Sequence, residues 1–205
     1  MSKIKLTYFD FSGGRGEPVR MALHAAGIDF EDKRLSFAEF AAIRGKLPFN
    51  ALPVMEIDGV TVTQSNAMCR YAGKRAGLYP TDDLQALYCD EVMGAVEDMS
   101  HHIGPTIGMT GEELKQAREK LVAGRMTVHL KGMAGLLKRG GGKYFVENRL
   151  TVADLKTFVQ TQWLTSGALD HVPKDLVQKL APGLVEHQSR IAREPVVTAY
   201  YASRK

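Results

Sequence analysis

The chain has 205 residues, of which 44% are hydrophobic and 24% charged, and a formal net charge of +4 at neutral pH. These proportions are typical of a soluble globular protein and exclude disordered and fibrous classes. No stretch approaches the roughly 20 consecutive apolar residues of a membrane-spanning helix. The first residues lack the apolar run of a signal peptide, and the basic residues are too thinly spread to favour nucleic-acid binding. We therefore expect a cytoplasmic protein with neither a membrane nor a nucleic acid as partner.

The two cysteines, Cys69 and Cys89, are too far apart for a C-x-x-C motif or a compact metal-ligand cluster. A disulfide scaffold is excluded for a chain of this size, and a reducing compartment is the simpler interpretation. The sequence therefore predicts neither a bound metal nor a redox-active cysteine pair.

The first predicted elements are a strand and a helix joined by a glycine-rich turn. Ile4, Leu6 and Tyr8 alternate with polar or small residues, which is the period of a strand. Pro18 stands where the first turn of a helix belongs, and Gly27 closes that helix.

The next segments complete a β-α-β-α-β-β-α order. Residues 30–34 predict a second strand, and residues 37–44 a short, weakly helical connection. Two apolar runs flank Asp58-Gly59, the dipeptide typical of a tight hairpin. Residues 65–75 then predict a helix that ends at Gly77. We therefore expect an α/β unit in which helices pack against a mixed sheet.

Strand signals disappear after residues 78–82, which form the expected domain boundary. The predicted domains are an α/β domain over residues 1–78 and an all-helical domain over residues 83–205. Apolar residues at helical spacing predict the helices of the second domain, which cover residues 84–103, 112–139, 152–166, 175–180, 184–193 and 196–202.

The end of the first strand is the first candidate site. A helix that begins near Arg15 directs backbone N–H groups and a positive dipole end toward the strand tip. The turn holds no cysteine pair, so thioredoxin-type disulfide exchange is excluded, and Tyr8 is the reactive polar side chain at this position. The alternative is that Tyr8 is simply an amphipathic residue at a strand edge.

Two further features lie around the predicted hairpin. Pro53 in Leu52-Pro53-Val54 fixes its own backbone and removes a donor at the sheet edge, and a cis bond there is an open alternative. Gln64-Ser65 opens a helix, where Ser65 is either a capping residue or part of a site that holds a carboxylate at the helix N-terminus.

Several segments together resemble the cytosolic glutathione transferases. They are similar to the tyrosine-type classes, and most of all to the sigma class, which includes prostaglandin D synthases. The likeness covers nearly the whole chain and rests on residues 5–9, 15–20, 52–54, 64–67, 70–71 and 151–154. It implies a thioredoxin-like fold for the first domain, a homodimer, and glutathione as the co-substrate.

The resemblance gives roles at the sulfur of glutathione. Tyr8 would donate its hydroxyl to the sulfur and stabilise the thiolate. Arg15 would assist as a nearby cation, which lowers a thiol pKa; the alternative for Arg15 is a solvent-facing residue of the helix.

The resemblance also implies how the rest of glutathione is held. The backbone of Leu52, next to Pro53, would pair with the cysteinyl part as an added strand does. Gln64 and Ser65 would bind the γ-glutamyl group. Asp98 of the partner subunit would reach the γ-glutamyl amine, unless it is an ordinary solvated carboxylate.

The glycine end of glutathione departs from the family pattern. Phe40 stands where the family often has tryptophan, so an indole N–H donor is missing. Ala51 stands where related proteins commonly carry a polar residue. Arg44 would therefore hold the glycine carboxylate, and weaker glutathione affinity is expected.

The electrophile site is less readable from the sequence. Apolar side chains beside the sulfur would line it, and the same residues are alternatively core. The adjacent residues His101 and His102 do not predict a metal site, because neighbouring helical residues point to different faces. The acidic residues Asp90, Glu97 and Asp98 are not sufficient to predict one either. The candidate pocket residues are Phe9, Phe11, Met99, His102, Ile103 and Met109.

Thr151 and Asp154 form a capping box at the start of a helix, with aspartate in place of the usual glutamate. In the family this box is a folding element, so it is assigned to structure and not to catalysis.

The sequence therefore predicts a glutathione transferase that adds the glutathione thiolate to small hydrophobic electrophiles in detoxification. One alternative is a glutathione-dependent isomerase or peroxidase that uses the same thiolate. The other is a non-catalytic, ligandin-like binder, against which the hydroxyl of Tyr8 argues.

Overall fold

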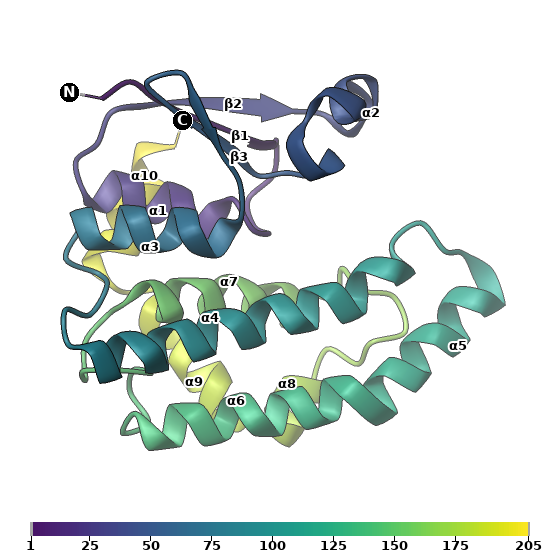
Figure 1. Cartoon of the computed structure of the whole chain (residues 1–205). Helices are drawn as coiled ribbons and strands as arrows, with labels where there is room; N and C mark the ends of the chain where they lie inside the picture. Colours follow the sequence, from purple (N-terminus) through teal and green to yellow (C-terminus); the bar gives the residue numbers. More distant parts are fainter. Residues whose placement is uncertain (1, 205) are drawn as a thin grey trace. The chain divides into compact units, whose positions relative to one another are not determined.

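The computed structural model describes residues 2–204 (Figure 1). The chain forms two compact units. The first holds the chain up to Tyr79 together with the segment from Pro195 onward, and the second holds Pro80–Glu194.

The first unit is built on a sheet with the strand order β2-β1-β3-β4. Its strands are β1 (Ile4–Phe9), β2 (Phe30–Leu35), β3 (Val54–Ile57) and β4 (Val60–Val62). β2 runs parallel to β1, whereas β3 runs antiparallel to both β1 and β4. Asp58 and Gly59 join β3 to β4 with φ angles of 51° and 84°, as the tight turn of a hairpin requires. The predicted α/β fold with its β-α-β-α-β-β-α order is confirmed.

Helices α1 (Glu17–Ala25) and α3 (Ser65–Arg75) lie side by side on one face of this sheet (Figure 1). Pro18 stands at the first positions of α1, and buried side chains from Val19 to Leu23 form its inner face. The last described helix, α10 (Pro195–Ser203), packs against α1. Helix α10 belongs to the compact unit that holds the sheet, and the domain bounds of 1–78 and 83–205 stay a prediction.

The segment 37–44, expected to be weakly helical, is a well-capped helix. Helix α2 (Phe37–Ile43) begins with a capping box in which Ser36 Oγ accepts from the Glu39 N–H at 3.2 Å and Glu39 accepts from the Ser36 N–H at 2.7 Å. This Ser-x-x-Glu pattern is visible in the sequence and was missed. Two short 3₁₀ turns, Arg44–Lys46 and Pro48–Asn50, lead from α2 to β3.

The second unit is helical throughout its regular elements. These are α4 (Asp83–Ile103), a 3₁₀ turn (Gly104–Thr106), α5 (Gly111–Leu121), α6 (Thr127–Arg139), α7 (Val152–Thr165), α8 (Leu176–Leu180) and α9 (Pro182–Ile191). Helix α7 is buried along most of its length and contacts α4, α8 and α9, so it forms the centre of this core.

The prediction of one continuous α-helix over residues 112–139 is wrong, because the helix is interrupted. A π-helical turn, Val122–Met126, separates α5 from α6. Gly124 lies in this turn, and Thr127 Oγ1 donates to the Val122 carbonyl at 2.6 Å, which satisfies an acceptor of the widened turn. Periodicity alone did not reveal the insertion because the apolar face continues on both sides of it.

No helix within residues 2–204 is both long and apolar enough to cross a membrane.

Candidate functional site

The topology of the sheet gathers the predicted glutathione-site segments at one end. β1 ends just after Tyr8, and its antiparallel partner β3 begins there, with Thr7 opposite Val54. β4 runs back to the same end, because Val62 pairs with Met55, and α3 begins shortly afterwards. The directions of the strands therefore bring Tyr8, Leu52 and Ser65 to the same end of the sheet, although they are far apart in the sequence.

Tyr8 is held tightly at this edge. The side chain is 5% exposed, and its hydroxyl oxygen accepts a hydrogen bond from the backbone N–H of Arg15 at 2.9 Å. A Cβ on Gly14 would lie 2.4 Å from the hydroxyl oxygen, and a Cβ on Gly16 would lie 2.4 Å from the ring. The glycine turn therefore folds directly over the tyrosine.

The structure gives Arg15 a role that the sequence did not predict. The sequence assigned its guanidinium to the sulfur, whereas the described contact is made by its backbone N–H. The guanidinium role stays a prediction. Because Arg15 lies in the turn before α1, its N–H also belongs to the donor-rich start of that helix.

Tyr8, Phe40 and Leu52 belong to one apolar cluster. Tyr8, Leu35, Leu52 and Val54 are its buried members, and Phe9, Phe40, Ile43 and Leu47 pack against it. The Leu52-Pro53 peptide bond is cis. Three of the residues predicted to hold or activate glutathione are thus adjacent through packing.

Arg44 lies on the surface beside this cluster. Its Nε donates to the Asn50 carbonyl at 3.2 Å, and its Cζ lies 5.9 Å from the Phe40 ring centroid. The guanidinium has five N–H groups in all, so this bond leaves others able to meet a carboxylate.

Gln64 and Ser65 differ in detail from the capping alternative. Gln64 is the N-cap of α3, with φ at 72°, and Ser65 is the first helical residue, so Ser65 does not cap the helix. Ser65 is 5% exposed, whereas Gln64 lies at the surface. The carboxylate-binding role of the pair stays a prediction.

Comparison with known proteins identifies the family. Residues 4–74 match the model described as Glutathione S-transferase, N-terminal domain, and residues 97–204 match Glutathione S-transferase, C-terminal domain. The second match alone covers more than half of the chain. The chain belongs to the glutathione S-transferase family.

Individual relatives agree with this assignment. Glutathione S-transferase 1 of Ascaris suum is 34% identical over 160 residues, which cover 76% of this chain and 77% of the relative. The prostaglandin synthase D of Nilaparvata lugens superposes with a TM-score of 0.85 at 26% identity, over 99% of this chain and 98% of the other. A sigma class GST of Fasciola hepatica gives 0.83 at 25% identity, over 100% and 97%. The predicted sigma-like glutathione transferase, with its thioredoxin-like and all-helical parts, is confirmed.

Aromatic rings surround the tyrosine of this glutathione S-transferase. Phe9 and Phe11 lie edge-on to Tyr8 at centroid distances of 5.3 and 5.8 Å. Phe37 lies 4.8 Å from Phe9 and stacks on Phe11 at 6.4 Å. Phe37 is 70% exposed and Phe11 is 38% exposed. We call Phe9, Phe11 and Phe37 the aromatic shelf; the sequence predicted its first two members and missed Phe37.

The predicted residues of the helical unit fall into two groups. Asp98 and His102 are exposed on α4. Met99 and Ile103 on the same helix are fully buried. Their assembly with Phe9 into one electrophile pocket stays a prediction, because Phe9 belongs to the other unit.

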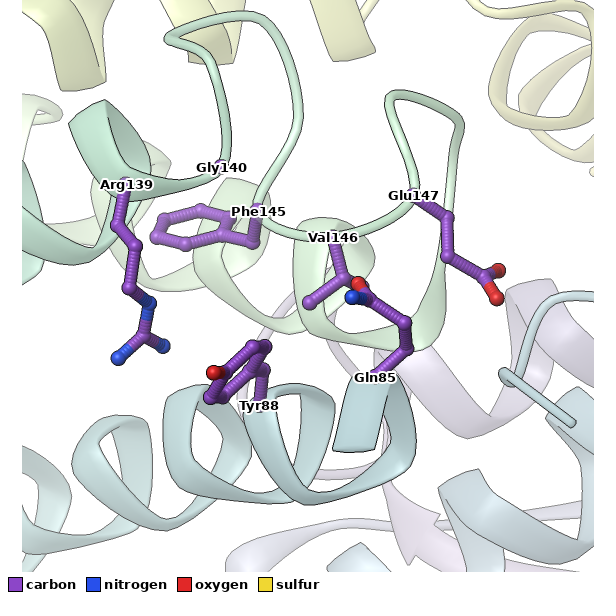
Figure 2. Close-up of a pocket in the computed structure, with 7 residues that line it drawn as sticks. All are labelled: Gln85, Tyr88, Arg139, Gly140, Phe145, Val146 and Glu147. Carbon is purple, nitrogen blue, oxygen red and sulfur yellow. The ribbon is translucent and has the colours of Figure 1, made fainter. Parts of the chain in front are cut away.

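A separate pocket of about 430 Å³ lies within the helical unit of the transferase (Figure 2). Gln85 and Tyr88 of α4 form one wall, and the end of α6 with the loop from Phe145 forms the other. The guanidinium of Arg139 lies 4.2 Å from the Tyr88 ring centroid and pairs with Glu91, and Glu147 pairs with Arg149. The two charged side chains that line the pocket, Arg139 and Glu147, are thus already in ion pairs. None of the predicted site residues lines this pocket.

Both cysteine thiols are buried, and burial raises the pKa of Cys89 to about 12. A thiol with such a pKa is protonated and unreactive at neutral pH. Within residues 2–204, no group of three or more His, Cys, Asp or Glu side chains is arranged to hold a metal ion.

Proposed function

We propose that Tyr8 activates glutathione in this transferase and that the thiolate is added to small hydrophobic electrophiles. Membership of the glutathione S-transferase family supports the reaction class. The observation that carries the mechanism is the hydrogen bond from the Arg15 N–H to the Tyr8 hydroxyl, because it fixes the oxygen at the end of β1. In the proposed complex the Tyr8 hydroxyl donates its proton to the sulfur of glutathione while it accepts from this N–H.

The energy required is within reach of this arrangement. A thiol with a pKa of ~8.5 is about 3% ionised at pH 7, and lowering that pKa by roughly 2 units makes it about three-quarters ionised. The shift corresponds to ~2.7 kcal/mol. One hydrogen bond to a charged group contributes ~1.5–3 kcal/mol. Tyr8 therefore accounts for most of the activation, and a cationic Arg15 side chain adds in the same direction.

The remaining parts of glutathione follow from the same sheet edge. The backbone of Leu52, beside the cis proline, presents hydrogen-bonding groups to the cysteinyl part, as in strand addition. Gln64 and Ser65 at the start of α3 offer polar groups and a helix N-terminus to the γ-glutamyl carboxylate. Arg44 binds the glycine carboxylate beside Phe40, which has no N–H to help it.

The aromatic shelf supports the nature of the second substrate. Its exposed rings are Phe11, which lies beside Tyr8, and Phe37, which stacks on Phe11. Contact with a hydrophobic electrophile would shield both rings from water.

We also propose that the active form is a cytoplasmic homodimer. In that dimer the exposed Asp98 reaches the γ-glutamyl amine bound by the partner.

A glutathione-dependent isomerase is the second candidate, since a structural relative carries the name prostaglandin synthase D. A substrate panel separates the two. For each compound, glutathione consumption and adduct mass are followed in parallel. Transfer predicts one glutathione consumed per adduct, whereas isomerisation predicts product without loss of glutathione. Binding of glutathione without any product across the panel would contradict both activities and favour a ligandin-like binder.

A further inference from the structure

A series of buried charges links α10 to the strand end that carries Tyr8. Glu17 and Arg20, on the first turns of α1, have side chains that are 0% exposed. Glu17 Oε1 accepts from Arg204 Nη1 at 2.7 Å, and Glu17 Oε2 accepts from Arg20 Nη1 at 3.3 Å. A buried carboxylate is stable only when it is paired, so these contacts hold each other in place.

Arg20 connects this pair to the backbone that follows Tyr8. Its Nη2 donates to the Phe9 carbonyl at 3.2 Å, and its Nη1 donates to the Phe11 carbonyl at 3.4 Å. Its Cζ lies 5.7 Å from the Tyr8 ring centroid. One guanidinium thus fixes the two carbonyls that lead from the tyrosine into the glycine turn.

Arg204 is itself fixed by the helix that precedes it. Its Cζ lies 5.6 Å from the Tyr200 ring centroid and 6.0 Å from that of Tyr201, and its side chain is 24% exposed. Burial, and then the nearby Glu17 carboxylate, raise the pKa of Tyr201 to about 12, so both α10 tyrosines stay neutral beside the ion pair.

The charge pattern shows why Arg204 matters to Arg20. Asp32 also binds Arg20, with Oδ1 3.0 Å from Nε, and has Arg34 as a second cation at 2.7 Å. In the same way, Glu17 binds Arg20 and has Arg204 as its second cation. With both carboxylates so balanced, Arg20 can direct its other N–H groups to the carbonyls. Loss of the Arg204 charge makes Glu17 draw the guanidinium of Arg20 toward itself and away from the carbonyls of Phe9 and Phe11.

We propose that Arg204 is a positioning residue for Tyr8, acting through Glu17 and Arg20. The catalytic part of this inference rests on the proposed role of Tyr8. Its structural part, that the charge of Arg204 holds the turn from Phe9 to Gly16, is independent of that role.

The test uses the full chain with Arg204→Gln, Arg204→Lys as the charge-preserving variant, and Arg193→Gln as a control. Arg193 is exposed and outside the network. Three readouts are measured: hydrogen exchange in peptides covering residues 9–16 of the ligand-free protein, the pKa of glutathione bound to each variant, and kcat/KM.

In Arg204→Gln we expect exchange in the turn to be faster, the bound thiol pKa to rise by about half a unit and kcat/KM to fall about threefold to tenfold. Arg204→Lys recovers most of each value, and Arg193→Gln matches the wild type. Unchanged exchange in folded Arg204→Gln would overturn the proposal, and faster exchange with an unaltered thiol pKa would overturn its catalytic part. If the wild type itself fails to lower the thiol pKa, the role of Tyr8 is wrong, while faster exchange in Arg204→Gln still supports the positioning.

Discussion

The position of the Tyr8 ring depends on a neighbouring glycine, Gly16, because a larger residue there would overlap the ring. A Cβ on Gly16 would lie 2.4 Å from Tyr8 Cδ1 and 2.5 Å from Cγ, which is closer than real contacts allow. The φ of Gly16 is −80°, so its backbone is one that any residue adopts. Glycine is therefore required at this position for the space that the ring occupies and not for backbone freedom.

Gly16→Ala should consequently displace the tyrosine without straining the turn itself. We expect kcat/KM with glutathione to fall at least about tenfold, because small misplacements of a reacting group are costly. The matched control is Gly132→Ala, in an exposed part of α6 where a Cβ meets open space. It should keep full activity and gain ~0.5–1 kcal/mol of stability. Wild-type kcat/KM in Gly16→Ala would show that the ring does not need this packing.

At this scale the sequence predicted residue types better than residue contacts. The positions of Tyr8 at a strand end and of Leu52 beside a proline singled them out, and the family resemblance gave their roles. The backbone role of Arg15, the fully buried Glu17–Arg20 pair and Gln64 as the N-cap of α3 were not predicted. These depend on which atoms of a loop approach one another, and hydrophobic patterning carries no information about that.

At the scale of the elements, one buried carboxylate, that of Asp154, stabilises the N-terminus of α7. Asp154 is 0% exposed and accepts from the Thr151 N–H at 2.8 Å, as the predicted capping box requires. It accepts from the Thr151 hydroxyl as well, at 2.7 Å. It also accepts from the Phe145 N–H at 3.1 Å and lies 2.9 Å from His187 Nε2. The last two partners were not predicted, because they come from a loop and from α9. The box thus joins several segments of the helical core.

Asp154→Ala should lower the free energy of unfolding by about 3–5 kcal/mol, because it leaves several buried donors unpaired. The comparison is Asp82→Ala, which removes the exposed N-cap of α4 that accepts from the Gln85 N–H at 2.9 Å. We expect it to cost about 1 kcal/mol. Urea unfolding gives both values. A fall in kcat per folded molecule of Asp154→Ala would contradict the assignment of this box to folding.

His129 connects α6 to α7, with a ring nitrogen 3.1 Å from Gln160 Oε1. Burial lowers the pKa of His129 below its ordinary value. As the pH falls below about 6.5, the unfolded chain therefore takes up a proton that the folded chain does not, and stability is lost over that window. Above it, the contribution is fully present.

His129→Gln should accordingly show a shallower loss of stability than the wild type between neutral pH and about pH 5.5. The measurement is the urea midpoint at each pH. His101→Gln, on the exposed side of α4, serves as control and should keep the wild-type slope. A wild-type slope in His129→Gln would exclude this histidine as a source of the pH dependence.

At the scale of the whole molecule, several large apolar side chains are exposed to water in a single chain. Phe49 is 79% exposed and Val60 is 66% exposed in the first unit, and Leu84 and Leu87 are 52% and 61% exposed on α4. A second copy of the chain that covers such groups would remove them from water, as the proposed homodimer requires.

Phe49→Asp should therefore weaken the dimer, because a charge would have to be buried at the subunit contact. Sedimentation velocity should show a dimer for the wild type and a monomer for this variant. Ile107→Asp changes a side chain that is similarly exposed, at 66%, and should stay dimeric. A monomeric wild type would contradict the proposed assembly, and a dimeric Phe49→Asp would exclude Phe49 from the contact.

The ultraviolet difference spectrum of bound glutathione across pH, in the wild type and in Tyr8→Phe, tests the central claim most directly. We expect the wild type to show the thiolate band well below the pKa of the free thiol. We expect Tyr8→Phe to move the band up by about 1 to 2 pH units, which is most of the shift and corresponds to one charge-assisted hydrogen bond. Saturable glutathione binding without a low-pH thiolate band in the wild type, or an identical band in Tyr8→Phe, would contradict the central claim.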